Sequence, residues 1–247
     1  MAELPTYVST WHQDVYPAIS ASNPHLSLTG KRIVMTGGAG GIGAAAAEAF
    51  TIAGAAEVFI LGRTLATLEA TVKAIKSRHA NANVVPIVCD ISSADSVAKA
   101  FEKIKQAGKI DVFVSNAGNM PNSDPITTID VNNLWKAFEI NVLGSILTTQ
   151  AALKNLTPSG TIINTTSAAA HVGFIPGYGG YAISKMAGIK LFEYFSWENE
   201  NVRVFNLQPG IIESTGLATQ AVEQTGIHWE QQDTGKSSTF IANMIEC

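Results

Sequence analysis

The feature that most constrains the fold of this chain is the alternation of short apolar runs, rich in β-branched residues, with longer segments of helical periodicity. Six runs of strand type span residues 31–36, 57–61, 84–88, 111–115, 161–165 and 202–207. The helical segments span residues 42–53, 65–78, 93–107, 131–153 and 181–197. Near-continuous apolar strands separated by helices are typical of a parallel sheet covered on both faces. Since crossovers are right-handed, the pattern predicts an α/β fold with a doubly wound parallel sheet.

The length of 247 residues fits a single domain of this class. Residues 1–29 are rich in Ser, Pro, Thr and isolated aromatics and lack periodicity, so we expect an extended N-terminal arm there. Residues 30–247 then form the folded domain.

Composition excludes several classes of protein. The net charge is -4 and no basic run is present, so we expect no nucleic-acid partner. No signal peptide or membrane span is predicted, and two cysteines are too few for a disulfide framework, which favours a cytoplasmic location. Only 15% of residues are charged, which suggests extra buried surface such as a subunit interface. We assign no metal site.

A glycine-rich turn, Thr36-Gly37-Gly38-Ala39-Gly40-Gly41-Ile42-Gly43, links the first predicted strand to the first helix. Glycines at a helix start let backbone N–H groups and the helix dipole face a pyrophosphate, which a Cβ would keep at a distance. Two registers fit: Gly38, Gly40 and Gly43 match G-x-G-x-x-G, whereas Gly37, Gly41 and Gly43 match T-G-x-x-x-G-x-G. The glycines alone leave both open. Either register predicts a dinucleotide site.

The end of the second strand indicates which dinucleotide binds. Gly62 and Arg63 stand where NAD-binding proteins place a carboxylate that accepts from the ribose 2′-hydroxyl. A guanidinium can instead donate two hydrogen bonds to a 2′-phosphate, so we expect NADP(H) as the cofactor. An ordinary solvated arginine is the alternative.

Four further motifs follow in order. Asn116-Ala117-Gly118 closes the fourth strand, Asn141 lies in the long helix, Ser167 follows the fifth strand, and Tyr181-Ala182-Ile183-Ser184-Lys185 begins the next helix. With the glycine turn, these motifs resemble the short-chain dehydrogenase/reductase family over roughly residues 28–214. The Trp11-His12 and Tyr16-Pro17 pairs are similar to the arm of fungal members. The resemblance implies a Rossmann-type domain and an oxidoreductase.

Tyr181 and Lys185 are four residues apart and therefore lie side by side on one helix face. An ammonium group favours the phenolate, so we expect Lys185 to lower the pKa of Tyr181 toward neutrality, which suits a general acid or base. The resemblance implies further roles. Lys185 also binds the nicotinamide ribose, Ser167 binds the substrate oxygen, and Asn141 holds a water that links Lys185 to solvent.

The resemblance also implies other cofactor contacts. Asp90 and Ile91 match an adenine-contacting position, although Asp90 could equally cap the helix that begins near Ser93. Ser214 and Thr215 both offer a hydroxyl to the carboxamide, and Ser214 is the expected donor. The predicted cofactor residues are Gly37, Gly41, Ile42, Gly43, Arg63, Asp90, Ile91, Asn116, Ala117, Gly118, Tyr181, Lys185, Pro209, Gly210, Ile212 and Ser214.

The loop between Ser167 and Tyr181 is expected to line a substrate pocket. It contains Val172, Phe174, Ile175 and Tyr178, whereas His171 is given no role. An apolar wall without Arg or Lys predicts a hydrophobic or aromatic ketone or alcohol, polyketide-like or terpenoid, rather than a small anion.

Only 37 residues follow Gly210, so the family's closing elements are predicted to be shortened. Residues 216–230 are expected to supply a lid helix, and the strand near residue 202 is expected to lie at a sheet edge. The resemblance implies a homodimer or homotetramer formed through the helices 131–153 and 181–197.

Two alternatives to a reductase remain. The first is a protein that binds NADPH without turnover, since fold alone does not fix function. The second is a non-redox isomerase, lyase or epimerase that uses the same acid and base residues.

Overall fold

A computed structural model describes residues 15–171, 174–210, 212 and 215–225. Its centre is one six-stranded sheet of order β3-β2-β1-β4-β5-β6, in which every pairing is parallel. The strands are β1 Arg32–Thr36, β2 Glu57–Gly62, β3 Val84–Val88, β4 Ile110–Ser115, β5 Leu156–Thr165 and β6 Arg203–Leu207. This order confirms the predicted doubly wound sheet, whose direction of winding reverses between β1 and β4.

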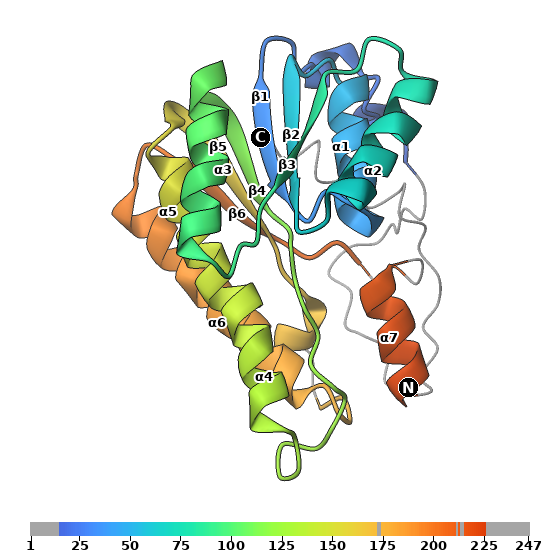
Figure 1. Ribbon diagram of the computed structural model, residues 1–247, viewed down its shortest axis with the longest axis vertical. Helices are drawn as coiled ribbons and strands as arrows, with labels where there is room; N and C mark the ends of the chain where they lie inside the picture. Colours follow the sequence, from blue (N-terminus) through green and yellow to red (C-terminus); the bar gives the residue numbers. More distant parts are fainter. Residues whose placement is uncertain (1–14, 172–173, 211, 213–214, 226–247) are drawn as a thin grey trace.

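Helices cover both faces of the sheet (Figure 1). They are α1 Gly41–Ile52, α2 Leu65–Arg78, α3 Ala94–Ala107, α4 Val131–Phe138, α5 Gly144–Leu153, α6 Gly179–Glu198 and α7 Gly216–Thr225. Buried residues of α1 and α2 pack on one face in one apolar cluster, and those of α3, α5 and α6 pack on the other face in a second cluster. The two clusters account for the near-continuous apolar strands in the sequence.

The structure departs from the predicted elements in two places. The helix predicted over 131–153 contains a π-helical turn, Glu139–Leu143, between α4 and α5. The fifth strand begins at Leu156, five residues earlier than predicted, and its register against β4 shifts between Ile110 and Val112. Pro158 and Gly160 hide this part of the strand in the sequence, since both residues are depleted in strands.

The capping of α3 shows which residue begins that helix. Ser93, rather than Asp90, is the N-cap of α3, and its side chain accepts a hydrogen bond from the backbone N–H of Ser96. The Asp90 carboxylate instead accepts from the backbone N–H and the hydroxyl of Ser92. Asp90 therefore stays at the end of β3 and is available to the pocket described below.

The described part of the N-terminal arm, residues 15–29, lies against the domain. Leu28 is buried in the α1 and α2 cluster and donates its N–H to the carbonyl of Ala53, and Thr29 forms an antiparallel bridge with Ala55. Two 3₁₀ turns, Pro17–Ile19 and Pro24–Leu26, precede them. The aromatic residues Tyr7 and Trp11 lie outside the described residues.

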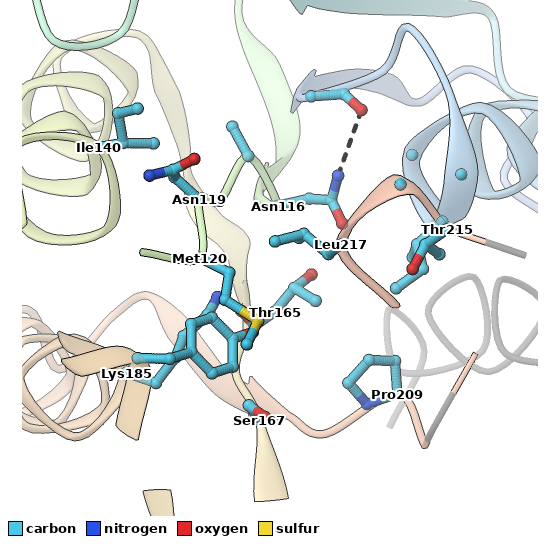
Figure 2. Close-up of a pocket in the computed structure, with 18 of the residues that line it drawn as sticks. Asn116, Asn119, Met120, Ile140, Thr165, Ser167, Lys185, Pro209, Thr215 and Leu217 are labelled. Atoms are coloured by element: carbon cyan, nitrogen blue, oxygen red, sulfur yellow. Dashed lines mark hydrogen bonds between the residues drawn. The ribbon is translucent and has the colours of Figure 1, made fainter. Parts of the chain in front are cut away.

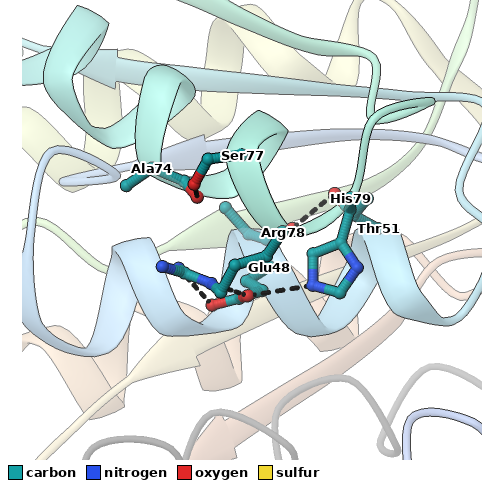
Figure 3. Close-up of polar contacts among 7 residues, drawn as sticks. Glu48, Thr51, Ala74, Ser77, Arg78 and His79 are labelled. Carbon is teal, nitrogen blue, oxygen red and sulfur yellow. Dashed lines mark hydrogen bonds and ion pairs between the residues drawn. The ribbon is translucent and has the colours of Figure 1, made fainter.

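An ion cluster joins α1 to the end of α2 (Figure 3). The Glu48 carboxylate accepts two hydrogen bonds from Arg78, at 2.6 and 2.8 Å, and lies 2.9 Å from His79 Nε2. The hydrogen bond from Arg78 is the main reason that the pKa of Glu48 lies below its ordinary value. The cluster links two helices that cover the same face of the sheet.

Within the described residues, β6 pairs only with β5, so it lies at a sheet edge as predicted. α7 supplies the first ten residues of the predicted lid helix, and residues 226–247 lie outside the description. In the described part of the chain, no helix is both long and apolar enough to cross a membrane.

Candidate active site

One large pocket, of about 1040 Å³, opens at the carboxyl ends of the strands. It extends from the glycine turn between β1 and α1, past the end of β4, to the start of α6. This is the switch point at which open parallel sheets bind ligands. Figure 2 shows side chains from these segments around one space, with Asn116 and Thr215 on one side and Ser167 and Lys185 on the other.

The glycine turn follows the register of Gly37, Gly41 and Gly43. Gly37 and Gly41 have φ of 70° and 52°, which L side chains rarely adopt. A Cβ on Gly43 would lie 2.1 Å from the Gly37 carbonyl oxygen, whereas one on Gly40 would meet nothing within 4 Å. A Cβ on Gly38 would clash with Ile60, so that glycine serves packing against β2. The geometry thus favours T-G-x-x-x-G-x-G over the register that needs Gly40.

Hydrogen bonds hold the glycine turn against the end of β4. The Thr36 hydroxyl accepts from the backbone N–H groups of Asn116 and Ala117, at 2.9 and 3.0 Å. Asn116 Nδ2 donates to the carbonyls of Thr36 and Gly37, and Figure 2 marks one such bond at Asn116. This leaves the backbone of the turn and the N-terminus of α1 facing the pocket, where they fit a pyrophosphate.

One end of the pocket carries charge. Arg63 and Thr64 follow β2, Asp90 and Ile91 follow β3, and all four line the pocket. The pKa of Asp90 is lowered, chiefly by the Ser92 hydroxyl and in smaller part by the charge of Arg63. Arg63 and Asp90 therefore lie near each other at this end of the pocket.

The opposite end of the pocket gathers Ser167, Tyr181 and Lys185. Lys185 Nζ donates to the Thr165 carbonyl at 2.9 Å and lies 5.8 Å from the centre of the Tyr181 ring. Burial raises the pKa of Tyr181 to about 12, against the smaller effect of a hydrogen bond with Ser167. Burial also lowers the pKa of Lys185 to about 8. Lys185 is not among the groups that shift the pKa of Tyr181, so the expected lowering toward neutrality is not found in the protein alone, where burial dominates.

Asn141 lies beside this group, in the π-helical turn, and does not line the pocket. Its Oδ1 accepts from the Asn119 N–H, and its Nδ2 donates to the Asn119 carbonyl and to the Ser184 hydroxyl. A Cβ on Gly118 would lie 3.4 Å from both Asn141 Oδ1 and Lys185 Nζ, so the two side chains flank that glycine. Asn141 fixes the loop after β4 next to the lysine.

An apolar wall closes the pocket near Tyr181. Met120 and Tyr178 are buried and pack with Ile175 and Leu217, and the Tyr178 ring meets the Tyr181 ring edge-on at 6.5 Å. Phe174 and Ile175 also line the pocket, as expected of the loop after Ser167. His171 is exposed and lies outside the pocket lining, and Val172 is not among the described residues.

Two glutamines hold α7 across the pocket. Gln220 Nε2 donates to the Met120 carbonyl at 3.2 Å, and Gln224 Oε1 accepts from the Ser123 N–H at 2.9 Å. Four residues apart, they lie on one face of α7. Leu217 of the same helix enters the pocket beside Met120, as Figure 2 shows.

Nearly all predicted site residues come together in this pocket. Asn141 stands behind it, and Ser214 lies outside the described residues, although the alternative donor Thr215 lines the pocket. The lining includes Gly37, Gly41, Ile42, Gly43, Arg63, Asp90, Ile91, Asn116, Ala117, Gly118, Ser167, Tyr181, Lys185, Pro209, Gly210 and Ile212.

Sequence reasoning missed several lining residues, among them Thr67, Asn119, Met120, Thr165 and Leu217. Asn119 and Met120 directly follow the Asn116-Ala117-Gly118 motif, and this position in the chain could have indicated that they line the pocket. Cys89 also lines the pocket, and burial raises its pKa to about 11, so its thiol stays protonated near neutrality.

Comparison with known proteins decides the family. The family model described as short chain dehydrogenase matches residues 31–226. The chain belongs to the short chain dehydrogenase family. Its members are oxidoreductases that use NAD or NADP, act on small molecules and are generally oligomeric.

Fungal proteins are among the similar members of the short chain dehydrogenase family. Mpl6 of Monascus purpureus is 32% identical over 228 residues, which cover 89% of this chain and 77% of that protein. AacuD of Aspergillus aculeatus is 30% identical over 225 residues, or 90% of this chain and 77% of that protein. Both are named short chain dehydrogenases, and they support the fungal type of this chain.

Two solved structures share the fold. An alcohol dehydrogenase from the archaeon Thermococcus sibiricus, complexed with 5-hydroxy-NADP, superposes with a TM-score of 0.78 and 27% identity, covering 88% of this chain and 91% of that one. Levodione reductase superposes with a TM-score of 0.76 and 27% identity, covering 80% of this chain and 77% of that one.

The register of the glycine turn gives a test by substitution. Gly43→Ala should lower the midpoint of thermal unfolding by about 3–10 °C, because the new methyl group meets the backbone carbonyl of Gly37 and neither can move freely. Gly40→Ala is the matched control and should leave the midpoint within about 2 °C, since its site is open and its φ of 178° is extended. Equal midpoints for the two variants would refute this register.

Proposed function

We propose that this protein is an NADP(H)-dependent oxidoreductase that interconverts a ketone and a secondary alcohol on an apolar small molecule. The observation that carries the proposal is the convergence of Ser167, Tyr181 and Lys185 at one end of a pocket whose other end is a glycine cradle. The nicotinamide cofactor, when bound, supplies or accepts the hydride. The chain's own residues bind the substrate, orient it and exchange a proton with its oxygen.

Tyr181 is the proposed general acid in ketone reduction, and Ser167 the group that binds the substrate oxygen. With its pKa raised to about 12, the Tyr181 hydroxyl stays protonated at neutral pH and is ready to donate. The reverse reaction needs the phenolate, whose formation burial opposes.

Lys185 is proposed to hold the nicotinamide ribose. With its pKa lowered to about 8, it is still largely protonated at pH 7. Asn141 is proposed to position the loop after β4 and the start of α6, through its hydrogen bonds with Asn119 and Ser184. The water relay through Asn141 stays a prediction.

The preference for NADP(H) rests on Arg63. Its guanidinium stands after β2 at the pocket, where a planar cation can donate to a ribose 2′-phosphate. The Thermococcus sibiricus relative, complexed with 5-hydroxy-NADP, is consistent with this choice. We propose Gly37, Gly41, Ile42 and Gly43 for the pyrophosphate, with Asp90 and Ile91 toward the adenine.

The proposed substrate is hydrophobic because of the wall around Tyr181. Met120, Tyr178, Ile175 and Leu217 supply apolar surface there, and no Arg or Lys other than Lys185 lines that end within the described residues. A small carboxylate ketone would find no cation to pair with beyond Lys185. A polycyclic or aromatic ketone of polyketide-like or terpenoid type fits better.

We further propose a homodimer or homotetramer formed through the predicted helices 131–153 and 181–197, which correspond to α4, α5 and α6. Trp135 on α4 is 62% exposed and Trp197 on α6 is 68% exposed, and Val131, Ile183 and Met186 add to the apolar surface. Large exposed apolar patches are typical of interaction surfaces. These residues lie on the helices through which the family resemblance implies assembly.

Tyr181→Phe should abolish NADPH oxidation with apolar ketones, because the phenyl ring cannot donate a proton, while NADPH binding stays within about twofold. Loss of NADPH absorbance across a ketone panel measures NADPH oxidation, and fluorescence titration measures NADPH binding. Turnover that persists in this variant contradicts the role of Tyr181. If the wild-type protein binds NADPH but oxidises it with no ketone, the non-redox or binding-only alternatives are favoured.

Arg63→Gln should weaken NADPH binding about 10- to 100-fold and leave NADH binding nearly unchanged, because charge-assisted hydrogen bonds to the 2′-phosphate are lost. Isothermal titration with both nucleotides measures this. Arg78→Gln, which removes a guanidinium bound to Glu48, serves as the control and should change neither affinity. Equal dissociation constants of the wild type for NADPH and NADH would overturn the NADP(H) preference.

Multi-angle light scattering should give a mass of at least two chains for the wild type. Trp135→Asp combined with Trp197→Asp should shift the mass toward one chain, because two carboxylates would have to be buried at the interface. Leu65→Asp places the same charge on an exposed leucine of α2 and should leave the assembly intact. A monomeric wild type refutes the proposal.

A further inference from the structure

Phe174 differs from the other large apolar residues of the described chain because it is almost fully exposed. It is 92% exposed, whereas the next most exposed, Val131 on α4, is 69% exposed. An aromatic ring in water forgoes the free energy that burial would give it. Phe174 is also one of the residues that line the pocket. An unburied ring at a ligand pocket is available to a ligand rather than to the core.

The backbone beside Phe174 is held in a fixed turn. The Tyr178 N–H donates to the Ile175 carbonyl at 3.1 Å, and Gly177 in this turn has a φ of 77°, which L side chains rarely adopt. A Cβ on Gly177 would lie 2.6 Å from the Ser123 carbonyl oxygen, so the turn is seated closely against the loop that follows β4. Residues 175–178 therefore fix the place at which Phe174 joins the pocket lining.

The same turn joins Phe174 to the end of the pocket where the ketone is proposed to bind. Ile175, its neighbour in the chain, packs with Tyr178, Tyr181 and Leu217 in one apolar cluster. The Tyr178 and Tyr181 rings meet edge-on at 6.5 Å. A ketone whose oxygen lies at the Tyr181 hydroxyl therefore has its apolar body beside this cluster, and Phe174 is the next residue along that wall.

We propose that Phe174 determines substrate specificity by packing its ring against an aromatic ring of the ketone. This rests on the proposed function and narrows its substrate class from apolar ketones to aromatic ketones. Aromatic rings in offset-stacked or edge-on contact attract one another beyond what the buried area contributes, whereas a saturated ring gains only the area. Phe174, Tyr178 and Tyr181 bring three rings to this pocket, so an aromatic substrate gains more from it than a saturated one.

The test compares two ketones that share one bicyclic carbon skeleton. One ring of 2-tetralone is aromatic, whereas both rings of 2-decalone are saturated. Dissociation constants are measured by isothermal titration into the protein loaded with NADP⁺, so that no turnover is needed. The wild type should bind 2-tetralone about 3- to 10-fold more tightly than 2-decalone, the gain expected from an aromatic contact beyond burial.

Phe174→Ala should weaken binding of 2-tetralone about 10-fold and reduce the preference to about twofold or less, because the area and the aromatic contact are lost together. Phe174→Leu keeps apolar bulk without a π-face, so it should lose the preference and keep most of the affinity for 2-decalone. Phe174→Tyr should behave as the wild type does. Leu65→Ala shortens an exposed leucine of α2 outside the pocket lining and, as the control, should change neither affinity.

Phe174→Ala should also leave the thermal midpoint, the mass in solution and the NADPH affinity unchanged, since an exposed ring at the ketone end supports neither folding nor assembly. A midpoint lowered by more than about 3 °C would show that the chain itself covers the ring. A fall in mass would show that a second copy covers it. Either result overturns the inference, as does a wild type without a preference for 2-tetralone or a Phe174→Ala variant that keeps the preference.

Failure of the proposed function gives a different result. A protein that binds 2-tetralone with the expected dependence on Phe174, but oxidises NADPH with no ketone, contradicts the oxidoreductase function and supports the role of Phe174 in binding an aromatic ligand. If neither NADPH nor NADP⁺ binds, the proposed function fails and the ketone titrations are run on the nucleotide-free protein. Turnover of ketones with no effect of Phe174→Ala on either affinity supports the function and overturns the inference.

Discussion

The pocket depends on one buried hydroxyl, that of Thr36, where β1 and β4 end side by side. It accepts from two successive backbone N–H groups of the next segment, at Asn116 and Ala117, and Asn116 in turn donates to the carbonyls of Thr36 and Gly37. These bonds satisfy polar groups at the point where the sheet changes its direction of winding. They hold the glycine turn open on the side that faces the pocket.

Burial sets the chemistry of the opposite end. The same loss of water that raises the pKa of Tyr181 lowers the pKa of Lys185, so each group is pushed toward its neutral form. Such a site opposes charge in the free protein and strengthens any interaction made with a ligand that enters. The proposed proton donor draws on this property.

Much of the fold was predictable because its signals are local. The order of strands and helices follows from apolar periodicity, and most boundaries lie within one or two residues of the prediction. The early start of β5 and the π-helical turn at Asn141 were not predictable, because the first depends on pairing with Ile110 and the second on contacts of Asn141 with Asn119 and Ser184. The capping role of Ser93 in place of Asp90 likewise depends on backbone geometry that two neighbouring polar residues leave open.

The sequence by itself determined the class of sheet, the position of the glycine turn and most of the polar residues that were predicted to reach the pocket, since these follow from patterns within short segments. Only the tertiary structure decided that Gly37 and Gly38 lack room for a side chain, because the atoms that would clash belong to Ala117, in the loop after β4, and to Ile60 on β2. It also decided the direction of the Tyr181 pKa, which depends on how much of the chain excludes water around the ring. Adjacency of Tyr181 and Lys185 is local, whereas desolvation is a property of the whole fold.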